Sequence, residues 1–286
     1  MSWIRKVLLS FAIAFLALSF LSVLYLFYLY QHREFRLQEL LLPLATKKCV
    51  DVPFLSAAEK QKIQGLFNQT YSYLGRGKQM TAFESADHRF VLKLFHPRPP
   101  LKMRYFRDFK KMRSLFSLKW ITAAFLKKEE RLLKLYQRYA LAFREIRDET
   151  GLLYVHLSDE SKFKDSLEVE IMDLDGVSSK VDLNRVPFVL QKKGELAKTR
   201  LLRLMQQNDL AELRAALAQL EELFWARAKK GITDRIQTLY NNYGFVDGRA
   251  IQIDVGRVWF DPTVAENPSL EVEKIMTRIH RKYKPA

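Results

Sequence analysis

The sequence has few cysteines, histidines, glycines and prolines, which argues against disulfide-bonded and zinc-binding proteins. A single cysteine, Cys49, excludes an intrachain disulfide, so the fold does not depend on an oxidising compartment. The five histidines are scattered without the spacing of metal ligands, which argues against a zinc site. Glycine and proline are few, at 10 and 9 of 286 residues, and the remaining composition is that of a globular protein. Acidic residues are outnumbered, and the net charge of +16 predicts an anionic neighbour: membrane, nucleotide or nucleic acid.

The N-terminal region contains a long run without charge, from Val7 to Tyr30. Its 24 residues would form a helix of about 36 Å, enough to cross a hydrocarbon core of about 30 Å. No small-x-small cleavage site follows it, so a retained transmembrane anchor over residues 1–31 is favoured over a signal peptide. Basic residues flank both ends, with the larger share after the run, which favours a single-pass protein with a cytoplasmic domain.

Two further segments precede or interrupt the predicted sheet. Residues 32–68 read as a juxtamembrane connector in which Ser56-Ala-Ala-Glu59 is a capping box that opens a short helix. Residues 102–128 are basic and aromatic with helical spacing. This segment is either a helix that lies on anionic lipid or an ordinary solvated helix with one packed face.

A glycine-containing turn and a lysine inside an apolar strand follow each other along the chain. Gly75 and Gly77 lie between two predicted strands, and Lys93 interrupts the apolar run from Phe90 to Phe95. Burying a lysine among apolar side chains is costly unless an anion meets it. The alternative is an edge-strand lysine whose ammonium reaches solvent.

A second constellation spans residues 231–256. Asp234 lies in a loop, and an Asp247-Gly248 turn between alternating apolar residues predicts a hairpin. The hairpin would hold Asn242 near one end and present Asp254 at its exit. An amide and two carboxylates brought together in this way suit a magnesium–phosphate site. A surface hairpin with ordinary turn acids is the competing interpretation.

These motifs together resemble the protein-kinase-like superfamily. The resemblance implies that Gly75 and Gly77 belong to a glycine-rich loop, without the usual third glycine, and that Lys93 binds phosphate. It implies a catalytic aspartate at Asp234 and metal ligands at Asn242, or its neighbour Asn241, and Asp254 of Asp-Val-Gly. The family's C helix should offer Lys93 a glutamate, for which Glu130 and Glu129 are the candidates. The spacing of Asp234 and Asn242, eight residues, departs from the family's five.

The resemblance also implies a fold. We expect an α+β, two-lobed protein-kinase-like fold with a small C-lobe, preceded by the transmembrane helix. Strands at 152–156 and 167–172 would complete a five-stranded sheet, followed by a hinge at Asp173–Gly176 and mostly helical structure from 186 to 230. The predicted segments are the anchor 1–31, the connector 32–68, an N-lobe 69–175 and a C-lobe 176–286. The 30 residues after Gly256 leave no room for a peptide-binding platform.

Two functions follow from these expectations. The first is a membrane-anchored phosphotransferase that uses ATP and Mg²⁺ on an unknown acceptor. The second is a catalytically inactive pseudokinase that acts as a membrane-tethered nucleotide- or protein-binding module. A nucleic-acid-binding protein is the least favoured, because no recognisable reading module is present.

Overall fold

The computed structural model describes most of the chain after residue 50. The described residues are 13–22, 24–25, 50, 52–53, 55–77, 79–96, 119–157, 163, 165–234 and 241–282, with side chains of 119–129 excepted. The chain divides into two compact units, residues 1–36 and 37–286, and the sheets and the candidate site belong to the second. The predicted basic segment 102–128 lies outside the described residues, apart from the helical backbone from 119 onward.

The predicted transmembrane anchor, and with it the single-pass membrane localisation and the cytoplasmic placement, is wrong. A crossing helix needs about 20 consecutive apolar residues. Among the residues that the structure describes, none of the helices is both long enough and apolar enough to cross a membrane. Of the predicted run, residues 13–22 and 24–25 are described and helical, and the rest lies outside the described residues.

The main sheet contains seven strands in the order β4-β7-β3-β2-β1-β5-β6. All neighbouring pairs are antiparallel except β1 and β5, which are parallel. The strands are β1 (Tyr71–Arg76), β2 (Met80–Ser85), β3 (Phe90–Phe95), β4 (Leu152–His156), β5 (Glu168–Met172), β6 (Ser178–Asp182) and β7 (Phe188–Lys192). β3 lies near the middle of this sheet and is buried at every position except Lys93, which is half-buried.

The predicted two-lobed, protein-kinase-like fold with a small C-lobe is also wrong. The sheet has seven strands where five were expected, and residues 37–286 form one compact unit, with no division into two lobes evident. The alternation at 167–172 correctly predicts a strand, but a period of two does not specify the neighbouring strand. β5 pairs with β1 and β6, so the predicted hinge at Asp173–Gly176 is the turn of the β5–β6 hairpin, with Gly176 at φ 78°.

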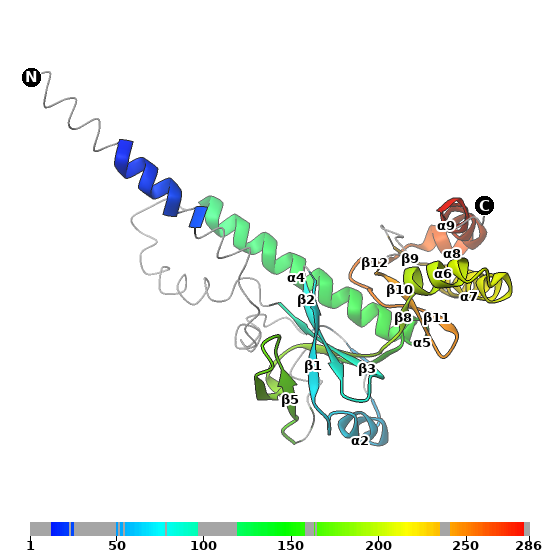
Figure 1. Cartoon of the computed structure of the whole chain (residues 1–286), viewed down its shortest axis with the longest axis horizontal. Coiled ribbons are helices and arrows are strands. Elements are labelled where there is room, and N and C mark those ends of the chain that lie inside the picture. The colour runs from blue at the N-terminus through cyan, green and yellow to red at the C-terminus, as the bar shows by residue number, and fades with distance from the viewer. Residues whose placement is uncertain are drawn as a thin grey trace, which may run out of the picture. The chain divides into compact units, whose positions relative to one another are not determined.

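The remaining elements continue the chain beyond the sheet, and Figure 1 shows α4 running past the strands toward α5 and β11. Before and between the strands lie α2 (Ala57–Gly65), α4 (Lys119–Glu145), α5 (Arg147–Thr150) and a 3-10 turn, Leu183–Arg185. After β7 come β8 (Glu195–Leu196), α6 (Ala197–Gln206), α7 (Leu210–Lys229), β9 (Ile232–Asp234), β10 (Tyr243–Val246), β11 (Arg249–Gln252), β12 (Val258–Phe260), α8 (Pro262–Glu266) and α9 (Pro268–Lys282). β8, β10 and β11 form a three-stranded sheet, and β9 pairs with β12.

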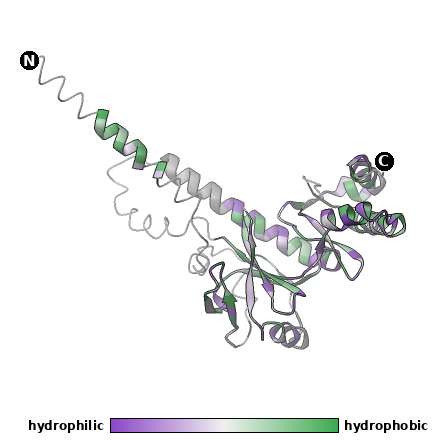
Figure 2. Cartoon of the chain, in the orientation of Figure 1, coloured by the Kyte–Doolittle hydropathy of each residue, from purple (hydrophilic) through white to green (hydrophobic). Residues whose placement is uncertain are grey.

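Two apolar cores position the region around residues 231–256. One joins α6, α7 and α9 to β10, and the other joins α4, β4 and β7 to Ile232, Val255 and Val258. The described part of α4 and the helices α6 and α7 carry both hydrophobic and hydrophilic residues (Figure 2), as expected of helices with one buried face. Because Val255 belongs to the α4 core, the segment after β11 is fixed against α4.

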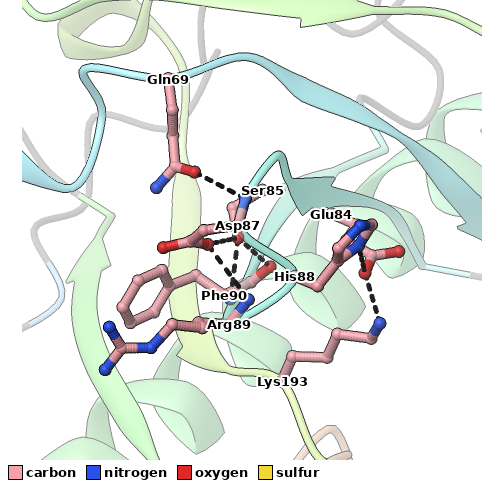
Figure 3. A network of polar contacts seen from close by, with 8 residues as sticks. All are labelled: Gln69, Glu84, Ser85, Asp87, His88, Arg89, Phe90 and Lys193. Carbon is pink, nitrogen blue, oxygen red and sulfur yellow. Dashed lines mark hydrogen bonds and ion pairs between the residues drawn. The ribbon is translucent and has the colours of Figure 1, made fainter.

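The β2–β3 turn is held by a polar network that also reaches the end of β7 (Figure 3). Ser85 donates its hydroxyl to Asp87 at 2.7 Å, and the backbone N–H of Asp87 donates to Gln69 at 3.1 Å. Glu84 accepts from Lys193, directly after β7. The network therefore helps to fix the β2–β3 register. In this register Lys93 lies opposite Ala82 of β2, and on its other side it lies opposite Val189 of β7.

Candidate active site

β3 contributes Lys93 to the site. Its ammonium donates a hydrogen bond of 2.8 Å to the carbonyl oxygen of Ile253, 160 residues away in sequence. Burial lowers the pKa of Lys93 to about 8, and the negative charge of Asp254 opposes that shift. The lysine that the sequence placed in an apolar strand thus lies next to the segment that leaves β11.

Asp254 follows β11 and is held by its own backbone. One carboxylate oxygen accepts the N–H of Gly256 at 2.8 Å, an Asx-type turn that leaves the carboxylate's other oxygen for further partners. The carbonyl of Gly256 accepts from Arg138 of α4 at 2.7 Å. A Cβ at Gly256 would lie 2.9 Å from Oε1 of Gln79 and 3.3 Å from Leu135, so Gln79 and α4 both approach this glycine closely.

Tyr139 of α4 is a neighbour that the sequence did not indicate. Burial raises the pKa of Tyr139 well above its ordinary value, and the charge of Asp254 raises it further. The phenol therefore stays protonated beside the carboxylate at neutral pH. An aromatic residue in a helical core stripe carries no sequence signal that separates this position from ordinary packing.

Asn242 lies beside Asp254 through its backbone. The Asn242 carbonyl accepts from the N–H groups of Ile253 at 2.7 Å and Asp254 at 3.3 Å. The predicted hairpin is confirmed, with Asp247 and Gly248 at φ 50° and 81° in its two-residue turn. Asn242 is half-buried, whereas the alternative Asn241 is exposed and lines a different pocket, against α6.

Asp234 ends β9 and is almost fully buried. Its carboxylate accepts from the side-chain amide of Gln252 at 3.1 Å, and the same amide nitrogen donates to the carbonyl of Asp254 at 3.1 Å. One glutamine therefore connects both predicted acids. Arg227 of α7 donates to the amide oxygen of Gln252 at 2.8 Å and to the hydroxyl of Tyr243 at 2.9 Å.

Gln252 and Arg227 were missed by sequence reasoning. The signal for Gln252 was a polar residue between Ile251 and Ile253 in a strand that alternates. Arg227 lies in a helix whose apolar stripe indicates only packing. Spacing along the chain could not assign Gln252, 25 residues away, as the hydrogen-bond partner of Arg227.

Three predicted site residues are not joined to this cluster by the bonds of the structure. Glu130 is exposed and pairs with Lys134 at 2.6 Å, while the hydrogen bond donated by Lys93 goes to Ile253. Gly77 donates to Met80 at 2.8 Å in the β1–β2 turn, and neither it nor Gly75 has a neighbour that only glycine would tolerate. The turn approaches the site through Gln79, which faces Gly256. The side chain of Glu129 lies outside the described residues.

A pocket of about 370 Å³ opens at Asp234. Trp259 and Val264 supply its apolar walls, and charged groups of both signs complete it. Its remaining lining residues are Thr233, Asp261, Glu271, Lys274 and Arg278. Two of the acids already have protein partners: Glu271 accepts from Thr233, and Asp261 caps α8 through Thr263. The pocket gives a small molecule access to the Asp234 side of the cluster.

The donor set suits a hard cation with few protein ligands. In the described part of the chain, no three His, Cys, Asp or Glu side chains gather as a metal centre would require. The backbones of Asn242 and Asp254 are hydrogen-bonded to each other, and both residues carry side-chain oxygens. Mg²⁺ is commonly held by one or two protein groups, with waters and phosphates completing its shell. These two residues would therefore suit a cation such as Mg²⁺ only if other groups, such as phosphate oxygens and waters, completed its shell.

Comparison with models of protein families finds no match for the chain, and neither does comparison with curated proteins. The resemblance of these motifs to the protein-kinase-like superfamily therefore stays a prediction, and the site has to be interpreted from its own geometry.

Proposed function

We propose that the chain is a phosphotransferase that moves the terminal phosphoryl group of ATP to a hydroxyl group of a small acceptor. One observation supports it most: Lys93, from one predicted motif, and Asp234 and Asn242, from the other, all bond to the segment from Gln252 to Asp254. Phosphoryl transfer uses a cation, carboxylates and an amide for positioning and charge stabilisation, and these are the side chains that the four residues carry.

Each residue has a role in the proposed reaction. Lys93 binds the phosphates of ATP, and Asp234 orients the acceptor hydroxyl and accepts its proton. The bond between the γ-phosphorus and the β–γ bridging oxygen breaks, ADP leaves, and the acceptor oxygen forms the new bond to phosphorus. Mg²⁺, held by Asn242 and Asp254, would neutralise phosphate charge. The pocket at Asp234 is where the acceptor enters.

A thermal-shift titration with Mg-ATP tests the nucleotide role. The unmodified chain should gain thermal stability as Mg-ATP is added, because a ligand that binds only the folded state stabilises it. Lys93→Ala should abolish that gain. Lys180→Ala, which removes an exposed lysine of β6, is the matched control and should respond like the unmodified chain. An unchanged response in Lys93→Ala would exclude the phosphate role.

A second function, nucleotide binding without transfer, is favoured by one observation. Lys93 is bonded to a backbone carbonyl, and Glu130, the carboxylate expected to orient it, pairs elsewhere. Release of ³²P-phosphate from γ-labelled ATP separates the two functions. Hydrolysis that Asp234→Asn abolishes supports transfer chemistry, whereas Mg-ATP binding without any hydrolysis or transfer supports the inactive module.

A further inference from the structure

Four polar side chains form a fully buried chain between α7 and the end of β9. Arg227, Tyr243, Gln252 and Asp234 are 1%, 0%, 0% and 2% exposed. Arg227 Nη1 lies 2.8 Å from Gln252 Oε1, and Gln252 Nε2 lies 3.1 Å from Asp234 Oδ2. Buried polar groups are costly unless each finds a partner of the opposite kind, so the direction of every bond in this chain matters.

The guanidinium decides which way the Gln252 amide points. Arginine can only donate hydrogen bonds, so the amide oxygen must face Arg227. The amide nitrogen must then face the other way, where it donates to Asp234 and to the carbonyl of Asp254. If the amide were flipped, its N–H groups would face the N–H groups of Arg227, and its oxygen would face the carboxylate of Asp234. It would lose all three bonds at once.

The buried guanidinium is not explained by packing alone. Within the described part of the chain, Nε and Nη2 of Arg227 have no hydrogen-bond partner, and the neighbouring rings are Phe224 at 5.4 Å and Tyr243 at 5.9 Å. Burying a charge that is incompletely paired is unfavourable, and apolar replacements of such groups are often as stable or more stable. A functional requirement at the other end of the chain of bonds accounts for the presence of the arginine.

We propose that Arg227 and Gln252 are positioning residues for Asp234: Arg227 fixes the Gln252 amide, and the amide holds the Asp234 carboxylate in the orientation that receives the acceptor. The same amide ties Asp234 to the backbone of Asp254, so the proton-accepting side and the phosphate side of the site share one support. This inference rests on the proposed phosphotransferase function.

Gln252→Glu tests the inference without removing the support of Arg227. The new carboxylate still accepts from Arg227, but it faces Asp234 with a negative charge and no N–H donor. With full-length protein and Mg-ATP, water serving as acceptor, we expect kcat for ATP hydrolysis to fall by about 10–100-fold. The KM for ATP should stay near that of the unmodified chain. The midpoint of thermal unfolding should fall, because a second buried carboxylate faces Asp234, so kcat is expressed per folded protein.

The arginine is tested by a graded pair of variants. Arg227→Lys keeps one donor for the amide oxygen and should retain part of the activity, whereas Arg227→Met should lose kcat as Gln252→Glu does. Asn184→Ala is the control, because Asn184 carries another side-chain amide that bonds to backbone groups, those of Phe163 and Asp165, none of which belongs to this chain of bonds. It should lower the unfolding temperature and leave kcat unchanged.

The outcomes separate the two proposals. If the unmodified chain hydrolyses ATP and Gln252→Glu does so with the same kcat, the positioning role is excluded and the phosphotransferase function stands. If kcat falls only in proportion to lost folded protein, the chain of bonds is structural and the inference is equally overturned. If the unmodified chain binds Mg-ATP but neither hydrolyses nor transfers its phosphate, the proposed function fails, and the positioning role fails with it.

Discussion

Lys93 loses its proton more readily in the folded chain than in the unfolded one, because burial lowers its pKa to about 8 from an ordinary 10.5. Between these values the unfolded chain binds more protons, so this lysine makes folding more favourable as pH rises through the window. Without metal or nucleotide, the free energy of unfolding of the unmodified chain, relative to Lys93→Met, should increase from pH 7 to pH 10. Parallel curves for the two proteins would contradict the pKa shift.

Gly244 is required by the close approach of two segments in the hairpin. A Cβ there would lie 2.5 Å from Cδ1 of Ile253 and 2.6 Å from the carbonyl oxygen of Glu195. Gly244→Ala should therefore lower the free energy of unfolding by about 1–3 kcal/mol. Gly65→Ala is the control, because a Cβ at Gly65 meets no atom within 4 Å and its cost should be near zero or negative. Chemical denaturation of both variants measures the difference.

The sequence pointed to side chains whose chemistry conflicts with their surroundings. A lysine in an apolar strand and acids around a glycine turn stand out, and Lys93, Asp234, Asn242 and Asp254 do lie around one segment. Glu130 was chosen by its distance in sequence from the next strand, but that distance does not say which turn of α4 faces β3. Gln252 and Arg227 become recognisable only when two chain segments meet.

At the scale of single elements, the entry to α2 carries the capping box that the sequence predicted. Ser56 Oγ accepts from the N–H of Glu59 at 3.2 Å, and Glu59 accepts from the N–H of Ser56 at 3.0 Å. Ser56→Ala should lower the free energy of unfolding by about 1 kcal/mol. Gln61→Ala, at an exposed position in the same helix, should change it little. Equal values for the two variants would show that the cap contributes nothing.

The positions of individual strands were easier to predict than which strands pair with each other. Alternation located β5 and the β10–β11 hairpin, and in the hairpin the tight turn also determines which strands pair. The pairing of β5 with the distant strand β1 has no such local signal. β7 was missed, because the short apolar run Phe188–Lys192 suits a buried helix and a buried strand equally well. Without β7 the neighbour of β3 could not be assigned. The expectation of five strands therefore lacked β7, inside the sheet between β4 and β3, and β6 at one edge.

At the scale of the whole molecule, residues 37–286 form a compact unit with its own cores. A unit of this kind can fold alone. A chain lacking residues 1–36 should keep the unfolding temperature of the full chain within a few degrees and should respond equally to Mg-ATP. Loss of the cooperative transition in the shortened chain would show that the second unit depends on the first.

The hydrogen bond from Lys93 to residue 253 uses a main-chain oxygen, so it places no constraint on which amino acid occupies position 253. Every amino acid offers the same carbonyl, so the contact survives any replacement at position 253 that the neighbouring packing tolerates. Saturation mutagenesis at this position would therefore record the fit against Gly244 and miss the polar contact altogether. Substitution at position 253 does not remove the acceptor of this hydrogen bond. Only a substitution of Lys93 removes the bond and shows what it contributes.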